Sequence, residues 1–252
     1  MSFAVTADAY DRFMGKFSIQ LGPQLADYAG VRSGQRVIDV GCGPGALTSE
    51  LVDRLGAANV FAIDPSEPFV AAARERFPEV DVRLAAADKI PFPDKTFDAA
   101  LAQLVVHFMS DPVAGLREMA RVLQKDGVVA ACVWDHGSGR GPLSVFWKAA
   151  RELDPDVADE SQGAGARQGS LTELFKKAGL RKVEETAIEA TVNQATFEEW
   201  WEPFTLGVGP AGDYTKKLDP DRRAKLMEGC RRLLPPPPFE LAAWAWTARG
   251  LA

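Results

Sequence analysis

The stretch Val37-Ile-Asp-Val-Gly-Cys-Gly-Pro-Gly-Ala46 decides the fold of this chain. An apolar run ends in a turn with three glycines, and Leu47, Leu51 and Leu55 then recur at the spacing of one helix face. Glycines let a ligand lie against the backbone of such a turn, and the first turn of the following helix offers free N–H groups and a positive dipole end. The pattern predicts a strand, a ligand-binding turn and a helix.

Short apolar runs and amphipathic stretches continue to alternate through the first half of the chain. Ser66 and the pair Asp111-Pro112 have the residue types that begin helices. Strands are expected at residues 35–40, 59–63, 80–84, 97–106 and 128–134. This alternation predicts an α/β fold with a doubly wound, Rossmann-like and mostly parallel sheet.

The alternation breaks down after residue 135. Residues 143–150 and 171–178 are expected to be helical, and the glycine-rich segment 161–170 between them is expected to be a mobile loop. Strands expected at 183–192 and 239–247 suggest an antiparallel hairpin. The residues between them, 195–238, have helix starts at Thr196 and Asp219, so we expect a helical insert that acts as a lid.

We therefore expect a single domain over residues 1–252. Its expected parts are an N-terminal cover (1–34), a cofactor-binding core (35–135), a helical segment with a loop (136–180) and the terminal hairpin with its insert (181–252).

Composition narrows the class of protein. The chain of 252 residues has 29 Lys and Arg against 35 Asp and Glu, a net charge of -6, which disfavours nucleic acid as a partner. Three widely spaced cysteines suggest neither a disulfide framework nor a zinc site. The longest apolar run, 128–134, is too short to span a bilayer, and no signal peptide is recognisable. A cytoplasmic location is expected, and the oligomeric state stays open.

Two acidic residues follow neighbouring strands, at the edge where doubly wound sheets bind ligands. Asp64 ends the second strand and can accept the two hydroxyls of a ribose, although a helix-capping role alone is an alternative. Asp88 follows the third strand and can accept from an adenine amino group, or be a solvated loop residue.

Several motifs together resemble the class I S-adenosylmethionine-dependent methyltransferases, in particular the small-molecule enzymes related to ubiquinone and menaquinone biosynthesis. They are Asp39-Val-Gly-Cys-Gly-Pro-Gly45, Asp64-Pro-Ser66, Ala87-Asp-Lys-Ile-Pro-Phe-Pro-Asp-Lys-Thr-Phe-Asp98, Gln103-Leu-Val-Val-His-Phe108 and Arg121-Val-Leu-Gln-Lys-Asp-Gly127. The similarity covers about half of the chain, from Tyr10 to Trp134. It implies a seven-stranded sheet whose last strand is antiparallel, and S-adenosylmethionine as methyl donor with S-adenosylhomocysteine as product.

The resemblance also implies contacts with the cofactor, residue by residue. The methionyl part would lie on the turn and beside the fourth strand, against Gly41, Cys42, Gly43, Gly45 and Gln103. Asp39 would bind within the turn or to the cofactor amino group, Asp64 the ribose, and Pro65, Ala87 and Asp88 the adenine. In the N-terminal cover, Tyr10 and Lys16 are the expected contacts.

Two other functions stay open. Gly41, Gly43 and Ala46 also satisfy the dinucleotide fingerprint of an NAD-dependent Rossmann oxidoreductase, and the fold can serve as a non-catalytic adenosyl-binding module. For catalysis, His107 is a candidate general base, whereas His136 is interpreted as a packed loop residue.

No residues have metal-ligand spacing, so turnover without a metal is expected. Aromatic residues outside the cofactor motifs are mostly expected in the core, but they also leave room for a small apolar or aromatic acceptor. They are Trp147, Phe197, Trp200, Trp201 and Phe204.

Overall fold

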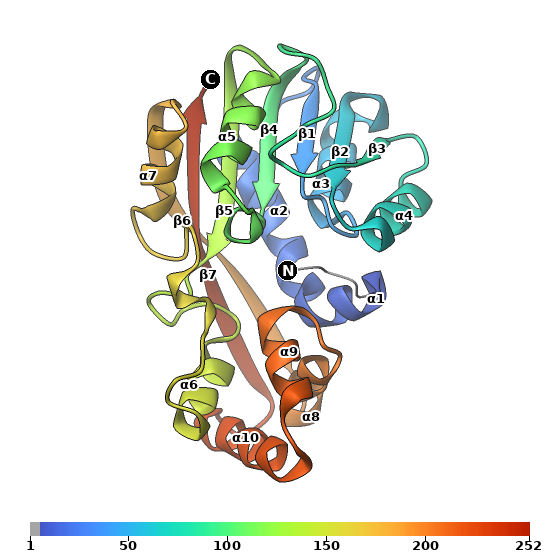
Figure 1. The fold of residues 1–252 in the computed structure, drawn as a ribbon. Helices are drawn as coiled ribbons and strands as arrows, with labels where there is room; N and C mark the ends of the chain where they lie inside the picture. The colour runs from blue at the N-terminus through green and yellow to red at the C-terminus, as the bar shows by residue number, and fades with distance from the viewer. Residues whose placement is uncertain (1–5) are drawn as a thin grey trace.

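The computed structural model describes residues 6–252, so the first five residues of the expected N-terminal cover lie outside the described part (Figure 1). The core is a seven-stranded sheet in the order β3-β2-β1-β4-β5-β7-β6. Its strands are β1 (Val37–Val40), β2 (Val60–Asp64), β3 (Asp81–Leu84), β4 (Phe97–Gln103), β5 (Leu123–Trp134), β6 (Arg181–Gln194) and β7 (Phe239–Leu251).

The pairing of the strands confirms the expected fold class. β1 lies in parallel between β2 and β4, and β7 runs antiparallel to both β5 and β6. All four residues of β1 are buried, because helices cover both faces of the sheet. The parallel strands therefore end together at one edge, where the crevice of a doubly wound sheet opens.

Helices cover the two faces as separate layers with separate apolar cores. α2 (Lys16–Ala29), α3 (Ala46–Leu55) and α4 (Glu67–Arg76) pack on one face, and α5 (Pro112–Arg121) and α7 (Ser170–Lys177) pack on the other. The expected start of α5 is confirmed, since the Asp111 carboxylate accepts from the backbone N–H of Ala114 at 2.9 Å. No described helix has the length and apolarity needed to cross a membrane.

The β6–β7 hairpin extends beyond the carboxyl ends of the parallel strands and, together with the segment that follows β5, carries a second, helical part of the molecule, the lower lobe (Figure 1). This lobe contains α6 (Ser144–Leu153), α8 (Phe197–Trp201), α9 (Gly209–Lys217) and α10 (Pro220–Leu233). Phe146 and Phe204 stack at its centre with ring centroids 4.6 Å apart. The aromatic residues that the sequence places outside the cofactor motifs are thus mainly core.

The short N-terminal elements join the two halves of the molecule. α1 (Ala7–Tyr10) and a π-helical segment, Asp11–Gly15, precede α2. Lys16 forms an ion pair with Glu199 of α8 at 2.5 Å, and Arg12 pairs with Glu202. Thr196 caps this helix as expected, since its hydroxyl accepts from Glu199 N, but the Glu199 carboxylate accepts from Ala195 N, one residue before the N-cap, so only half of the expected capping box is formed.

The expected helical insert contains one helix that the sequence did not predict, because α9 begins at Gly209 and Gly212 packs on the backbone of Gly207. Two expected strand boundaries are also wrong. β4 ends at Gln103, and Leu104 follows with a φ of 61°. β5 begins at Leu123 rather than 128, so Gly127 lies within a strand.

The glycine-rich segment 161–170 is a loop, as expected, and part of it is packed. Ala166 is fully buried, and its carbonyl accepts from Gly137 N at 2.9 Å. Its mobility stays a prediction.

The aromatic stack predicts a large loss of stability on truncation. Phe146→Ala is expected to lower the free energy of unfolding by about 3–5 kcal/mol, because Phe146 is fully buried and its removal leaves a cavity. Ile19→Ala is the control: Ile19 is 65% exposed, so a change within about 0.5 kcal/mol is expected. Urea unfolding measures both, and equal losses would show that Phe146 does not hold the lower lobe together.

Candidate functional site

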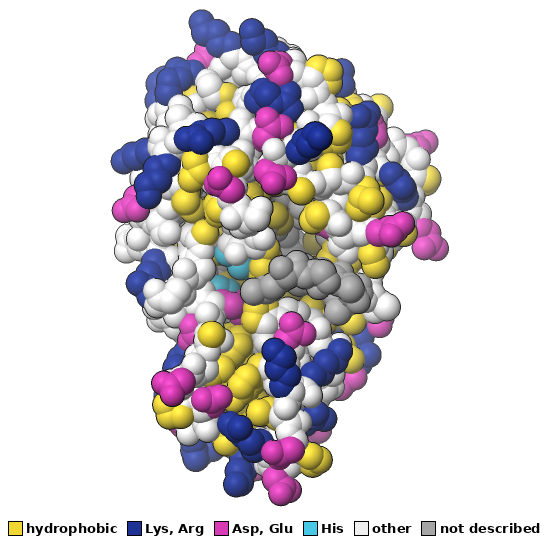
Figure 2. Space-filling model, viewed as in Figure 1, with side chains coloured by type: hydrophobic (Ala, Val, Ile, Leu, Met, Phe, Trp, Pro, Cys, Tyr) yellow, Lys and Arg dark blue, Asp and Glu magenta, His cyan; other side chains and the backbone are white. Residues whose placement is uncertain are grey.

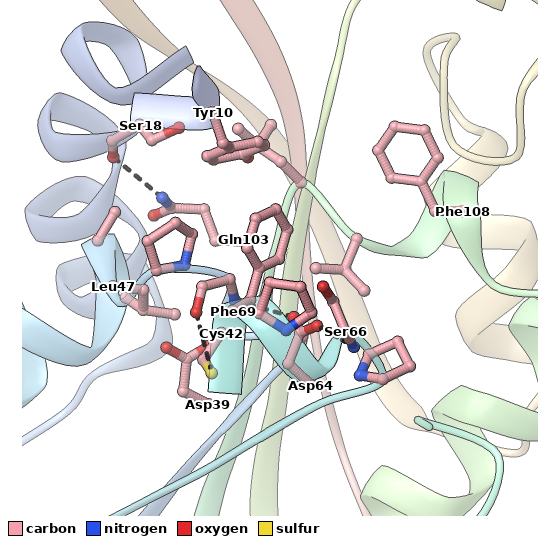
Figure 3. Close-up of a pocket in the computed structure, with 18 of the residues that line it drawn as sticks. Tyr10, Ser18, Asp39, Cys42, Leu47, Asp64, Ser66, Phe69, Gln103 and Phe108 are labelled. Atoms are coloured by element: carbon pink, nitrogen blue, oxygen red, sulfur yellow. Dashed lines mark hydrogen bonds between the residues drawn. The ribbon is translucent and has the colours of Figure 1, made fainter. Parts of the chain in front are cut away.

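A cavity of about 350 Å³ lies at the carboxyl ends of β1, β2 and β4 (Figure 3). Its floor is the turn after β1 and the loop after β2, its far wall is the segment after β4, and α1 and α2 close it from the N-terminal side. Segments widely separated in the sequence therefore meet at the edge where ligands bind to such sheets.

The three glycines of the first turn have positive φ for different reasons. A Cβ on Gly41 would lie 2.5 Å from Val105, and one on Gly45 would lie 2.4 Å from Phe77, so neither position has room for a side chain. A Cβ on Gly43, with a φ of 54°, would meet nothing within 4 Å. Because Gly43 lines the cavity, its open side is where a ligand can approach the backbone.

The N–H groups of this turn are already used within the protein. Those of Gly41 and Cys42 donate to the carbonyl of Ile63 at 2.7 and 3.0 Å, and that of Gly43 donates to Asp64 Oδ2 at 2.9 Å. A pyrophosphate-binding turn needs such groups free to donate to the ligand. The geometry therefore disfavours the dinucleotide interpretation of the glycine pattern.

Asp39 is a fully buried carboxylate beside this turn. Its Oδ2 accepts from the Thr48 hydroxyl at 2.7 Å, whereas the buried Oδ1 has no hydrogen-bond partner among the described residues. Burial raises the pKa of Asp39 to about 7, and nearby Asp64 adds to this effect. An unpaired buried acceptor that lines a cavity is a position for a ligand donor.

Asp64 holds the floor of the cavity together. Its Oδ1 accepts from Ser66 N at 2.8 Å and its Oδ2 from Gly43 N, so it has a structural role besides any ligand contact. Burial raises the pKa of Asp64, although the two N–H bonds favour its charged form. Two carboxylates next to each other make this end of the cavity suited to a cation and unsuited to a pyrophosphate.

Several other predicted residues also line the cavity. Tyr10, Cys42, Pro65 and Gln103 do so, and Gln103 Nε2 donates to the Ser18 carbonyl at 3.0 Å, as the dashed line in Figure 3 shows. Gln103 Oε1 is buried without a partner among the described residues. Burial raises the pKa of Tyr10 to about 12, so its hydroxyl stays protonated at neutral pH.

Four predicted contacts do not line the cavity. Lys16 is paired with Glu199, and Gly45 packs on Phe77. Asp88 is exposed on the loop after β3, and Ala87 packs at the edge of the apolar core under α5. The adenine contact of Asp88 therefore stays a prediction.

Other lining residues were not identified from the sequence. Phe69 lies at the start of α4 with its ring 5.4 Å from that of Tyr10, and Phe108 follows β4 (Figure 3). The sequence showed Phe69 only as part of an apolar helix face, because helical spacing does not distinguish core from cavity wall.

A second, smaller cavity of about 40 Å³ adjoins the first. Tyr10, Leu104 and Phe108 line both. Most of the other residues around the second cavity are apolar, and they include Phe13, Met14, Trp134 and Leu143. A ligand placed here would therefore be next to the first cavity in apolar surroundings.

Three polar side chains, His107, His136 and Glu160, also line the second cavity. Burial and neighbouring His136 lower the pKa of His107 to about 3, and burial lowers that of His136 to about 4. Burial raises the pKa of Glu160 to about 7. Glu160 was not recognised from the sequence, and His136, interpreted there as a packed loop residue, joins the site.

Comparison with known proteins agrees with this geometry. A family model described as a methyltransferase domain matches residues 38–131. The demethylmenaquinone methyltransferase of Tropheryma whipplei is 41% identical over 110 residues, 42% of this chain and 45% of that protein. The phosphatidylethanolamine N-methyltransferase of Cereibacter sphaeroides is 34% identical over 151 residues, 58% of this chain and 72% of that protein.

The chain spans about half the length of the curated relatives that it matches, the Cereibacter enzyme excepted. Among solved structures, geranyl diphosphate methyltransferase in complex with S-adenosylmethionine superposes with a TM-score of 0.53 at 16% identity, covering 93% of this chain and 85% of that one, which supports the fold alone. The strand order, the glycine turn with its two carboxylates and these matches lead to one conclusion. The chain belongs to the class I S-adenosylmethionine-dependent methyltransferases.

Proposed function

We propose that the protein transfers the methyl group of S-adenosylmethionine to a small apolar or aromatic acceptor. The observation that carries this proposal is the buried, unpaired oxygen of Asp39 in a cavity that Asp64 also lines. S-adenosylmethionine has an ammonium and a sulfonium group, so its charge complements the two carboxylates. NAD would place a pyrophosphate where the carboxylates lie and the turn N–H groups are occupied.

The residues present fit the cofactor. Asp39 would accept from its amino group, and Asp64, which keeps lone pairs free beyond its two N–H bonds, would accept from the ribose hydroxyls. Gly43 would allow the close approach of the methionyl part. When bound, S-adenosylmethionine supplies an electrophilic methyl group on a positively charged sulfur.

The acceptor would occupy the second cavity, which at about 40 Å³ has to widen to hold it. Tyr10, Leu104 and Phe108 form the boundary of both cavities, so a nucleophile placed there faces the first cavity. Its apolar walls would orient the acceptor and exclude water, and orientation alone contributes much to a displacement of this kind. His107 is the candidate base: with its lowered pKa it is neutral at physiological pH and has a lone pair to accept a proton.

Two measurements test the function. Calorimetric titration is expected to show binding of S-adenosylmethionine and S-adenosylhomocysteine but not of NAD. A screen of apolar acceptors with methyl-labelled S-adenosylmethionine is then expected to show labelled product. Cofactor binding without turnover on any acceptor would support the non-catalytic module, and binding of NAD alone would overturn the proposal.

The buried Asp39 predicts that cofactor affinity depends on pH. With a pKa of about 7 in the free protein, its carboxyl is mostly protonated at pH 6, and binding of a cation must then displace that proton. Affinity is expected to rise about fivefold from pH 6 to pH 7 and about twofold more before it levels off near pH 8. Titration calorimetry at these pH values measures this slope.

Asp39→Asn is the matched variant, because its amide oxygen can still accept from Thr48. It is expected to weaken binding about tenfold or more and to lose the slope. Because the pKa of Asp39 is raised in the folded state, the free wild type loses stability as the pH rises through about 7. The Asp39→Asn variant has no carboxyl group at this position, so it is expected not to show this loss. An unchanged slope in the variant would assign the titration to another group.

Gly43 predicts a steric test of the turn. Gly43→Val is expected to abolish detectable cofactor binding, since the added methyl groups would enter the cavity. Gly34→Val is the control, because Gly34 also has a positive φ, 87°, and open space around it, but does not line the cavity. Both variants are expected to lose about 1–2 kcal/mol of stability, and only Gly43→Val to lose binding. Equal binding by both would leave Gly43 with a structural role only.

We also propose that the insert 195–238 acts as a lid, since Val208, Gly209 and Pro210 line the second cavity. Opening of this segment would admit the acceptor. Limited proteolysis is expected to cut between residues 207 and 214 in the free protein and to be suppressed by S-adenosylhomocysteine with an acceptor analogue. Equal resistance in both states would make the insert a fixed wall, as its packing on α6 allows.

A further inference from the structure

His107, His136 and Glu160 form a compact cluster from three separate segments of the chain. His107 lies in the 3-10 turn Val106–Phe108 after β4, His136 follows β5, and Glu160 begins the turn Glu160–Gln162. One nitrogen or oxygen atom of each side chain lies within 4.8 Å of the others. Among residues 6–252 no other group of three His, Cys, Asp or Glu side chains has this arrangement.

The polar atoms of the cluster are buried and unsatisfied. His107 Nδ1 and His136 Nε2 have no hydrogen-bond partner among the described residues. The side chains of His136 and Glu160 are only 4% and 10% exposed, and His136 Nε2 lies 3.9 Å from Glu160 Oε1, too far for a hydrogen bond. Buried polar atoms are nearly always paired, so two such imidazoles beside a carboxylate need an explanation.

The surrounding protein holds Glu160 through its own side chain and positions the segment that carries His136. Trp147 Nε1 donates to Glu160 Oε2 at 3.0 Å, which leaves Oε1 for another partner. The Asp159 carboxylate accepts from Ser161 N and thereby shapes the turn that carries Glu160. The segment of His136 is held by Asp135, whose carboxylate accepts from Arg140 at 2.7 Å. Such outer contacts are typical of side chains that orient toward a bound ion.

We propose that His107, His136 and Glu160 bind a divalent transition-metal ion, with Zn²⁺ as the reference ion. Two imidazoles and one carboxylate are a ligand set that zinc and iron sites use, and such sites keep further coordination positions open. Around zinc, ligand atoms lie about 3.4 Å apart, so the three groups would converge by about 1 Å on binding. The cavity of about 40 Å³ between them leaves room for this movement.

The open positions would face the acceptor. Figure 2 shows small patches of histidine surface, in cyan, between the two halves of the molecule, so the edge of the cluster reaches the surface although its candidate ligand atoms are buried. Tyr10, Leu104 and Phe108 separate it from the cofactor cavity. This geometry suits an apolar acceptor whose hydroxyl oxygen coordinates the ion.

That assignment of the acceptor rests on the proposed function. The coordinated hydroxyl would release its proton to solvent, and its oxygen would bond to the methyl carbon. The methyl–sulfur bond breaks at the same time and leaves its electron pair on sulfur. The ion would thus supply the activation of the hydroxyl, and His107 would serve as a ligand of the ion instead of as a base.

Metal binding is measured without turnover, so that its result does not depend on the proposed function. The full chain, stripped with EDTA and dialysed, is titrated with Zn²⁺ by calorimetry and with Co²⁺ by absorption spectroscopy. One ion per chain is expected, with a cobalt spectrum that lacks thiolate charge-transfer bands, because the buried cysteines are not part of the cluster. Zn²⁺ is also expected to raise the melting temperature of the wild type.

Three variants and one control complete the test. His107→Ala, His136→Ala and Glu160→Gln are each expected to lower Zn²⁺ affinity by at least about 100-fold and to lose the thermal shift. Glu160→Gln keeps an acceptor for Trp147, so it guards against a loss caused by misfolding. Glu152→Gln, at an exposed position of α6 and paired with Arg232, is expected to bind Zn²⁺ as the wild type does.

The outcomes separate the two proposals. Zn²⁺ binding that the variants lose supports the metal site, even if no acceptor is methylated. Absence of Zn²⁺ and Co²⁺ binding, or binding that all three variants retain, overturns the site, while unchanged binding of S-adenosylmethionine leaves the proposed function standing. A thiolate spectrum with Co²⁺ would also overturn it, by moving the ion to the cysteines.

Discussion

The carboxylate of Asp64 is the contact on which the cofactor cavity depends. It accepts from the backbone N–H of Gly43 after β1 and of Ser66 after β2, so it ties together the two loops that form the floor. This arrangement requires β1 and β2 to be parallel neighbours that end at the same level, which the register from Val37 with Val60 to Val40 with Ile63 provides. With the turn N–H groups used in this way, the floor presents carboxylate oxygens and a glycine surface rather than donors. The preference for a cation thus follows from how the turn is built.

The sequence predicted the half of the molecule in which local pattern and tertiary structure agree. β1, β2 and β3 were placed to within two residues, because each is a short apolar run bounded by turn residues. The start of α5 was placed correctly because Asp111 and Pro112 determine it locally. Asp39, Gly43 and Asp64 were placed at the cavity for the same reason: strand ends of a doubly wound sheet meet at one edge.

The features that the sequence did not predict depend on contacts between distant segments. α9 contains two glycines, which disfavour a helix locally, and it forms where Gly212 can pack on Gly207. Lys16 has the positive charge that a ligand contact can use, but it forms an ion pair with Glu199, which is far away in the sequence. Glu160 comes from a loop with no motif, and only folding brings it to the two histidines. Spacing along the chain cannot reveal a site whose members share no helix or turn.

The β6–β7 hairpin has a consequence for how enzymes of this kind diversify. β7 pairs with β5 only from Ala245 to Leu251, and its first residues, from Phe239 on, pair with β6 alone. Three helices of the lower lobe, α8, α9 and α10, are thus attached to the sheet by one two-stranded arm, in addition to the side-chain contacts with the N-terminal segment, whereas α6 is connected to the end of β5. Insertions or exchanges at the tip of that arm leave every strand that holds the cofactor floor untouched. The hairpin can therefore serve as a graft point, at which the helices that border the second cavity can be exchanged without rebuilding the strands under the first.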